Sequence, residues 1–234
     1  MKRFFVFAMF LWTGIMGVSA QSNKFDLNDD GKVNVSDVTL LITYILGQDN
    51  GGQVTHQAVD LGLPSKTKWA SCNVGATKPE EYGGYYAWGE TEEKEVYDES
   101  TYKYYQNDEY VNLGSDISGT EYDVAHVKWG GNWRMPTKEE CKELIDNCTS
   151  EWTTLNGVKG RKFTSNINGN SIFLPAAGDR WGGELYDAGS WGVYWSSAQD
   201  PSYSRYAYYL IFSSSDAHWY DDYRSYGFTV RPVR

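Results

Sequence analysis

The sequence predicts an α+β domain of short antiparallel strands, one main helix and long loops, preceded by a small loop–helix unit. Two observations predict this class. After residue 58 most of the chain consists of short apolar runs separated by glycine turns, a pattern typical of antiparallel strands. One stretch, Trp133–Cys148, instead spaces its apolar residues as a helix does.

Residues 1–20 are predicted to be a secretory signal peptide. Lys2 and Arg3 precede an apolar run, and small residues occupy the cleavage positions at residues 18–20. No cysteine follows that position, and no later run approaches the ~20 apolar residues that a membrane-spanning helix needs. We therefore expect a protein that is secreted, or located in the periplasm or at the cell surface, with no lipid anchor and no membrane span.

The composition excludes one class of partner and favours another. With a net charge of −10, the chain is a poor candidate for nucleic-acid binding, because phosphate contacts require lysine and arginine. The chain has 19 tyrosines and 10 tryptophans, so many aromatic rings must lie at or near the surface. Exposed rings suit stacking on sugars or proteins, although tyrosine is also a good strand former.

Residues 26–37, DLNDDGKVNVSD, predict a calcium-binding loop of the EF-hand type. Oxygen ligands alternate around a turn glycine, and a helical apolar stripe follows and ends at Gly47. The alternative is an Asx-rich turn that caps this helix. The candidate Ca²⁺ ligands are Asp26, Asn28, Asp30, Lys32 through its backbone carbonyl, Asn34 and Asp37.

This loop and helix resemble one half of a type I dockerin, the module that docks onto cohesins in secreted polysaccharide-degrading systems. The resemblance implies calcium binding and a cohesin-like partner. Dockerins normally carry two such repeats, and one is found here. The expected organisation is therefore a signal peptide at 1–20, a dockerin-like segment at 21–47, a polar glycine-rich linker at 48–57 and a main domain at 58–234.

The helix predicted within Trp133–Cys148 has both an entry signal and an apolar face. Thr137 and Glu140 have the spacing of a capping box at its start. Cys141, Leu144 and Ile145 then recur with Cys148 at helical spacing. We interpret this helix as scaffold, because buried helical stripes usually belong to a core.

The remaining elements of the main domain are predicted from turn residues. Asn156-Gly157 and the Asn-Gly-Asn run at 168–170 lie between apolar runs and predict hairpins. The acidic, tyrosine-rich residues 91–122 and the glycine- and aromatic-rich residues 178–192 are predicted to be long loops. The chain then continues with the strand candidates VYWSS, RYAYYLIF and YGFTVRPV.

Several runs of the main domain resemble the Fibrobacter succinogenes major paralogous domain, including VDLGLPSKTKWASCNVGA, DVAHVKWGGNWRMPTKEE and YGFTVRPV. A more distant similarity is to formylglycine-generating enzymes. Together these imply a C-type-lectin-like α+β fold and bring no established activity. The enzymes use a cysteine pair late in the domain, but no cysteine follows Cys148, and no G-x-S-x-G motif is present. We therefore expect no catalysis.

The chain contains three cysteines, and export would permit a disulfide. Cys141 and Cys148 are about 10 Å apart along the predicted helix, which is beyond disulfide reach. Any bridge would therefore include Cys72, and we favour Cys72–Cys148. The alternative is three buried thiols.

Aromatic residues in the later loops form the candidate ligand site. They are Trp181, Tyr186, Trp191, Trp219, Tyr220 and Tyr223. Such residues suit a recognition or adhesion module for a glycan or a cell-envelope protein. One alternative is a docking component of a cell-surface polysaccharide-utilisation assembly. Another is that these rings belong to the core, in which case the recognition site would lie in residues 91–122 or nowhere in this domain.

Overall fold

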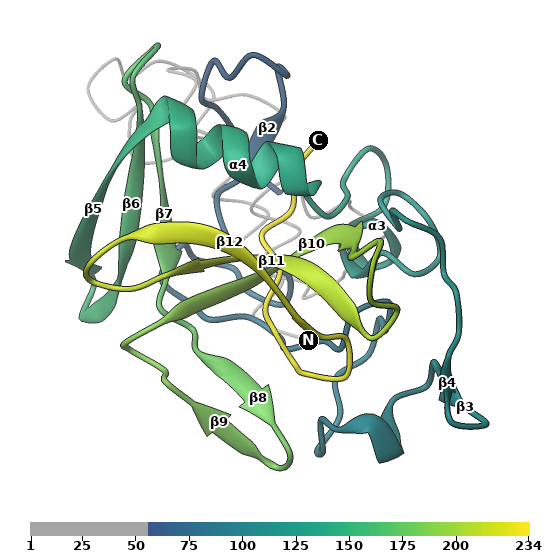
Figure 1. The fold of residues 1–234 in the computed structure, drawn as a ribbon. Helices are drawn as coiled ribbons and strands as arrows, with labels where there is room; N and C mark the ends of the chain where they lie inside the picture. Colours follow the sequence, from purple (N-terminus) through teal and green to yellow (C-terminus); the bar gives the residue numbers. More distant parts are fainter. Residues whose placement is uncertain (1–55) are drawn as a thin grey trace, which may run out of the picture. The chain divides into compact units, whose positions relative to one another are not determined.

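The computed structural model describes residues 56–234 (Figure 1). The chain divides into two units between Val54 and Thr55, and the described residues belong to the second unit. The predicted calcium-binding loop and the helix that follows it lie outside the described residues.

The predicted α+β class is wrong for the described residues, which are mostly β. Strands account for 39% of these residues and helices for 11%. The strands form five small antiparallel sheets of two or three strands each. The sequence prediction underestimated the strand content because several strands are only two or three residues long, too short to show alternation.

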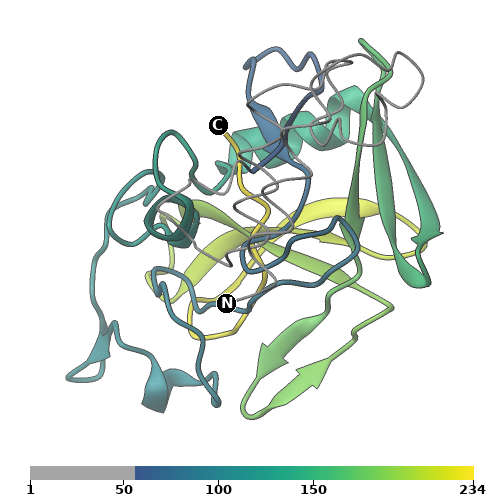
Figure 2. The same cartoon turned by 180° about the vertical axis from the view of Figure 1, so that it is seen from behind.

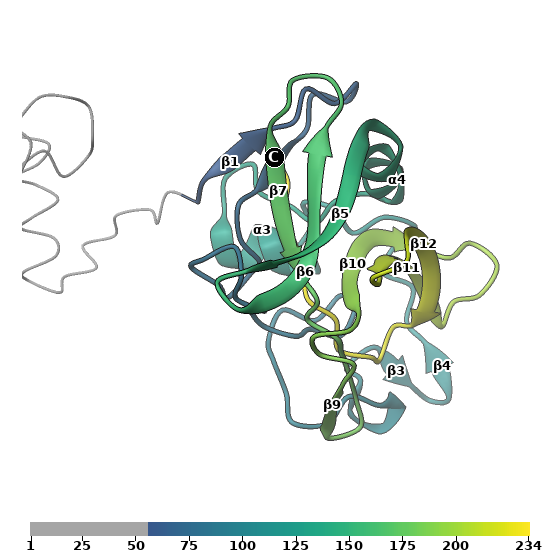
Figure 3. The same cartoon turned by 90° about the vertical axis from the view of Figure 1, so that its left-hand side faces the viewer.

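The strands of the described residues are named as in Figure 1. They are β1 (Ala58–Asp60), β2 (Lys68–Ala70), β3 (Tyr105–Gln106), β4 (Glu109–Tyr110), β5 (Cys148–Leu155), β6 (Val158–Ser165), β7 (Ser171–Pro175), β8 (Asp179–Trp181), β9 (Glu184–Tyr186), β10 (Gly192–Gln199), β11 (Tyr206–Phe212) and β12 (Ala217–Tyr223). The two largest sheets have the strand orders β5-β6-β7 and β10-β11-β12 (Figure 3).

The main helix is where the sequence predicts it. Helix α4 (Lys138–Asn147) begins with Thr137 as N-cap, and the capping box with Glu140 is present. Cys141 and Leu144 are buried on its inner side, and Ile145 is partly buried there. The helix ends at Asn147, so Cys148, the last residue of the predicted stripe, is the buried first residue of β5. The inner side of α4 packs against β10, β11 and β12 and against the start of β5 (Figure 1). The prediction of a structural helix is confirmed. A shorter helix, α3 (Val124–Trp129), is capped by Asp123.

Both predicted hairpins are confirmed. Asn156 and Gly157 connect β5 to β6 with φ values of 48° and 87°, the positive values that a tight type I′ turn requires. Residues 166–170 connect β6 to β7.

Several strands occur where the sequence indicated none. Residues 91–122, predicted to be a loop, contain the short paired strands β3 and β4. Residues 178–192, predicted to be a loop, contain the β8–β9 hairpin, in which Gly182 and Gly183 form the turn. Strand β12 pairs along its full length with β11, although its sequence AHWYDDY is polar. It is an edge strand with largely exposed side chains, and exposed edge strands lack the apolar alternation on which the prediction relies.

The β10–β11–β12 sheet separates two parts of the core. On one side, Trp195 is fully buried, donates its indole N–H to the carbonyl of Tyr86 at 2.8 Å, and stacks on Phe228 with ring centroids 4.0 Å apart. On the other side, Tyr194 and Phe212 pack in the cluster that contains Leu144 of α4. Side chains alternate across a strand, so neighbouring residues of β10 serve both sides.

Residues 228–233 tie together segments that are distant in the sequence. Phe228 pairs with Tyr86, and Val233 forms bridges with both Trp69 and Arg134. Arg231 is 1% exposed and donates to four acceptors. These are the side-chain oxygen of Asn73 and the carbonyls of Ala70, Ser71 and Phe173.

The predicted Cys72–Cys148 disulfide is absent, and all three cysteines are buried free thiols. The Cys72 thiol donates to the carbonyl of Ala76. Cys148 instead packs with Cys141 and Leu144 in the cluster beneath α4. The two sulfurs therefore occupy different surroundings, which is the arrangement of the alternative that the sequence left open. Burial raises the pKa of each of the three thiols.

Candidate ligand-binding site

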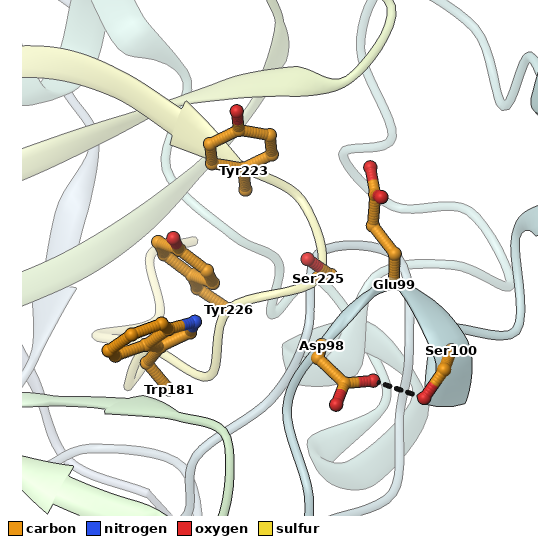
Figure 4. Close-up of a pocket in the computed structure, with 7 residues that line it drawn as sticks. All are labelled: Asp98, Glu99, Ser100, Trp181, Tyr223, Ser225 and Tyr226. Atoms are coloured by element: carbon orange, nitrogen blue, oxygen red, sulfur yellow. Dashed lines mark hydrogen bonds between the residues drawn. The ribbon is translucent and has the colours of Figure 1, made fainter.

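A pocket of about 360 Å³ lies where the β8–β9 hairpin approaches the segment before β3. Both lie at the same end of the domain in front and back views (Figures 1 and 2). Three separate parts of the sequence contribute to it. The lining residues are Asp98, Glu99, Ser100, Trp181, Tyr223, Ser225 and Tyr226 (Figure 4).

Trp181 is held in place by backbone bonds on both sides. Its neighbour Arg180 exchanges two hydrogen bonds with Gly227, at 2.8 and 2.9 Å. Its other neighbour, Gly182, exchanges two with Tyr97, at 2.8 and 3.0 Å. Gly227 follows Tyr226 and Tyr97 precedes Asp98, so the two bridges fix all three parts of the pocket around the Trp181 ring.

Gly227 is required for one of these bridges. A Cβ at this position would lie 2.6 Å from the ring of Tyr97, closer than packed atoms tolerate. The absence of a side chain therefore allows the segment that follows β12 and carries Tyr226 to approach both Arg180 and Tyr97.

Aromatic rings form one side of the pocket. The Trp181 ring centroid is 6.4 Å from that of Tyr226, which in turn is 5.4 Å from that of Tyr223. Tyr186 lies beside Trp181 at 5.9 Å. Trp181 is 53% exposed, so much of its ring remains available to a ligand. Figure 4 shows the rings of Trp181, Tyr223 and Tyr226 on one side of the pocket and the carboxylates of Asp98 and Glu99 on the other.

The opposite side of the pocket is acidic. Asp98 caps the short 3₁₀ helix Glu99–Thr101 and accepts hydrogen bonds from the Ser100 hydroxyl at 2.7 Å and from the Thr101 N–H at 3.1 Å. The Ser100 bond is the main reason that the pKa of Asp98 lies below its usual value. Glu99 accepts a hydrogen bond from the Tyr110 hydroxyl. Both carboxylates are therefore oriented by neighbouring residues.

A buried arginine anchors the acidic side. Arg224 is fully buried and donates to the Tyr102 hydroxyl at 3.0 Å and to the carbonyls of Val111 and Ser204. Its guanidinium also lies 4.8 Å from the ring centroid of Trp88. Tyr102 directly follows the 3₁₀ helix, so this arginine links the acidic segment to the end of β12.

The structure brings only part of the predicted aromatic set together. Trp181 and Tyr223 line the pocket, and Tyr186 flanks Trp181. Trp191 is 38% exposed but does not line it. Trp219 instead packs against Tyr208, with the amine of Lys138 3.8 Å from its ring centroid. Tyr220 follows Trp219 in β12, and its side chain therefore projects from the opposite face of the strand.

Sequence reasoning missed the other members of the site. Tyr226 lies in a run that looked like a strand, where aromatic residues are common and carry no signal of exposure. Asp98, Glu99 and Ser100 were part of an acidic segment without a clear period. Their role depends on the bridge between Tyr97 and Gly182, a long-range contact that local patterns do not reveal.

Between residues 56 and 234 no group of three or more histidine, cysteine or acidic side chains is arranged to hold a metal ion. The predicted calcium ligands at 26–37 lie outside this range.

Asp179 of β8 is the carboxyl whose pKa is raised to about 6, mainly by burial and also by the charges of Asp187 and Asp222.

Two family models match parts of the chain. Residues 24–62 match the Dockerin type I domain. This segment is dockerin-like. The match supports a calcium-binding docking module with a cohesin-like partner. It extends beyond the predicted end at residue 47 and includes β1.

The second match covers residues 145–233 and is to a Domain of unknown function (DUF8237). No curated protein and no solved structure matches the chain. The predicted Fibrobacter succinogenes major paralogous domain and the C-type-lectin-like fold are therefore not confirmed. Among the described residues, no helix is both long enough and apolar enough to cross a membrane.

Proposed function

We propose that this chain is a secreted, non-catalytic recognition protein. Its main domain binds a glycan or a cell-envelope protein in the pocket beside Trp181, and its dockerin-like segment docks onto a partner with the help of calcium. The observation that carries the proposal is the half-exposed Trp181 ring, fixed by backbone bridges on both sides and joined by Tyr223 and Tyr226.

The geometry of the pocket supports binding rather than core packing. Large aromatic rings that remain exposed on a rigid framework provide apolar contact area at a small cost in conformational entropy. Polar groups opposite the rings can fix the orientation of a ligand, as in most binding pockets. The non-catalytic assignment agrees with the sequence, which lacks a nucleophile elbow and a late cysteine pair.

We expect Trp181→Ala to weaken ligand binding by about tenfold, because a stacked ring contributes on the order of 1 kcal/mol. The full chain should be applied to a glycan array and to immobilised cell-envelope proteins, followed by titration of each positive. Trp191→Ala is the matched control, since Trp191 is also exposed and lies outside the pocket. Equal binding by wild type and Trp181→Ala would contradict the proposal.

The match at residues 24–62 favours a second candidate function, a docking component of a cell-surface polysaccharide-utilisation assembly. In this case the dockerin-like segment attaches the protein to the assembly, and the main domain is carried into the assembly with it. The two candidates are distinguished by the Trp181→Ala experiment, because docking through residues 24–62 does not require the pocket.

Calcium binding should depend on the side chains of Asp26 and Asp30. Replacing both with alanine removes two anionic ligands, and we expect the calcium affinity of the full chain to fall by at least tenfold in calorimetry. Lys32→Ala is the control, because this position contributes only a backbone carbonyl. Equal affinities of the double variant and wild type would show that the loop at 26–37 is not the site.

A further inference from the structure

We propose that the pocket beside Trp181 selects uncharged sugar chains and rejects polyuronates and other anionic glycans. This inference rests on the proposed function and identifies its ligand class. It follows from the combination of an aromatic side and an acidic side within one pocket of about 360 Å³.

The aromatic side matches the shape of a pyranose ring. A sugar ring has apolar C–H faces, and these stack on flat aromatic surfaces while the hydroxyls project outwards. Trp181 offers such a surface, with 53% of the residue exposed and its backbone fixed through Arg180 and Gly182. The rings of Tyr226 and Tyr223 follow at centroid spacings of 6.4 and 5.4 Å and are tilted by 59° and 46° relative to their neighbours, so Trp181 provides the flat stacking face and the two tyrosines border it.

The acidic side provides hydrogen-bond acceptors for those hydroxyls. Asp98 uses Oδ1 to accept from Ser100 and Thr101, and Glu99 uses Oε1 to accept from Tyr110. Among the described residues, no donor is bonded to Oδ2 of Asp98 or to Oε2 of Glu99. Ionised carboxylates form strong bonds with hydroxyl donors.

Charge then determines which sugars enter. The lining contains two carboxylates and neither lysine nor arginine. A carboxylate or sulfate placed against the acidic side would face these two carboxylates with no lysine or arginine in the lining, and like-charge juxtaposition disfavours wrong partners. The nearby Arg205 guanidinium lies on the other side of the pocket, 5.5 Å from the ring centroid of Tyr223. The net charge of the whole chain, −10, adds to the repulsion at longer range.

A cationic ligand is the competing occupant, because aromatic rings and carboxylates also attract amines. The surroundings favour a neutral ligand. The guanidinium of Arg205 already lies 5.5 Å from the ring centroid of Tyr223 and 4.8 Å from that of Tyr206. A second cation on the Tyr223 side of the pocket would be repelled by it.

The test is affinity electrophoresis of the full chain at low ionic strength, where charge effects are least screened. Gels should contain a soluble glucan, mannan or xylan as neutral probes, polygalacturonate or alginate as anionic probes, or polylysine as the cationic probe. We expect retardation by at least one neutral polysaccharide and by neither anionic one. Trp181→Ala should lose at least about tenfold in affinity for the neutral probe, and Trp191→Ala should retain it.

Asp98→Asn tests the charge directly, because it retains the size of the side chain. We expect several-fold weaker binding to the neutral polysaccharide and measurable binding to polygalacturonate. Asp108→Asn is the control, since Asp108 is an exposed residue of the same segment outside the pocket lining, and it should change neither.

The outcomes separate this inference from the proposed function. Binding of wild type to an anionic polysaccharide or to polylysine that Trp181→Ala abolishes would overturn the inference and leave the recognition function standing. The absence of retardation by every neutral probe would also overturn the inference. If Trp181→Ala also leaves every interaction on the glycan and envelope-protein arrays unchanged, the proposed recognition function is contradicted as well.

Discussion

Replacing Trp195 with alanine should lower the free energy of unfolding by about 3–5 kcal/mol, the usual cost of truncating a buried tryptophan. Trp195 is fully buried at the centre of β10, and its ring stacks on Phe228. The substitution also leaves the carbonyl of Tyr86 without the indole donor. Urea denaturation of the two proteins, followed by circular dichroism, measures the difference.

Trp191 provides a control a few residues earlier in the chain. It is 38% exposed, so Trp191→Ala should change the free energy of unfolding by about 1 kcal/mol or less. A loss of several kcal/mol in this control, or a change below about 1 kcal/mol in Trp195→Ala, would contradict the assignment of Trp195 to the core and of Trp191 to the surface.

Arg231→Ala should have a comparably large effect, which we expect to be roughly 4 kcal/mol. The guanidinium satisfies three buried acceptors and one that is part-buried, and each buried acceptor left without a donor costs about 1–3 kcal/mol. Part of this loss is offset because the variant no longer buries a charge, and burial already lowers the pKa of Arg231. The same denaturation experiment measures the net result.

Arg234→Ala is the matched control for Arg231. Its guanidinium is exposed and lies 4.8 Å from the ring centroid of Trp133, a contact worth about 0.5–1 kcal/mol at an exposed site. If Arg231→Ala were no more destabilising than Arg234→Ala, residues 228–233 would not anchor the domain.

Local patterns in the sequence predicted the elements that depend on local interactions. The Thr137–Glu140 capping box and the stripe of α4 involve residues within a few positions of each other, and both are present. The Asn156-Gly157 turn is specified by the positive φ values that asparagine and glycine tolerate. In each case the interaction that stabilises the element lies inside the element.

The pocket could be predicted only in part, because it depends on pairings between distant residues. The aromatic residues that the sequence indicated in the later part of the chain include Trp181 and Tyr223, and both line the pocket. Nothing in the sequence showed that Tyr97 pairs with Gly182, the contact that places Asp98 beside Trp181. The expected Cys72–Cys148 bridge failed for the same reason, because spacing along the chain does not show which buried cluster each cysteine joins.

The bridges made by residues 228–233 also affect how the domain folds. These residues pair with Trp69 and Tyr86 near the start of the domain and with Tyr194 in β10. Chains whose contacts join distant residues fold slowly, since loop closure must precede the contacts that stabilise it. During synthesis β1 and β2 can form their hairpin early. The backbone groups of Trp69 and Tyr86 that pair with residues 228–233 stay unpaired until those residues have left the ribosome. We therefore expect the tertiary structure of the domain to form in a single late step. Until that step the chain should remain loosely packed.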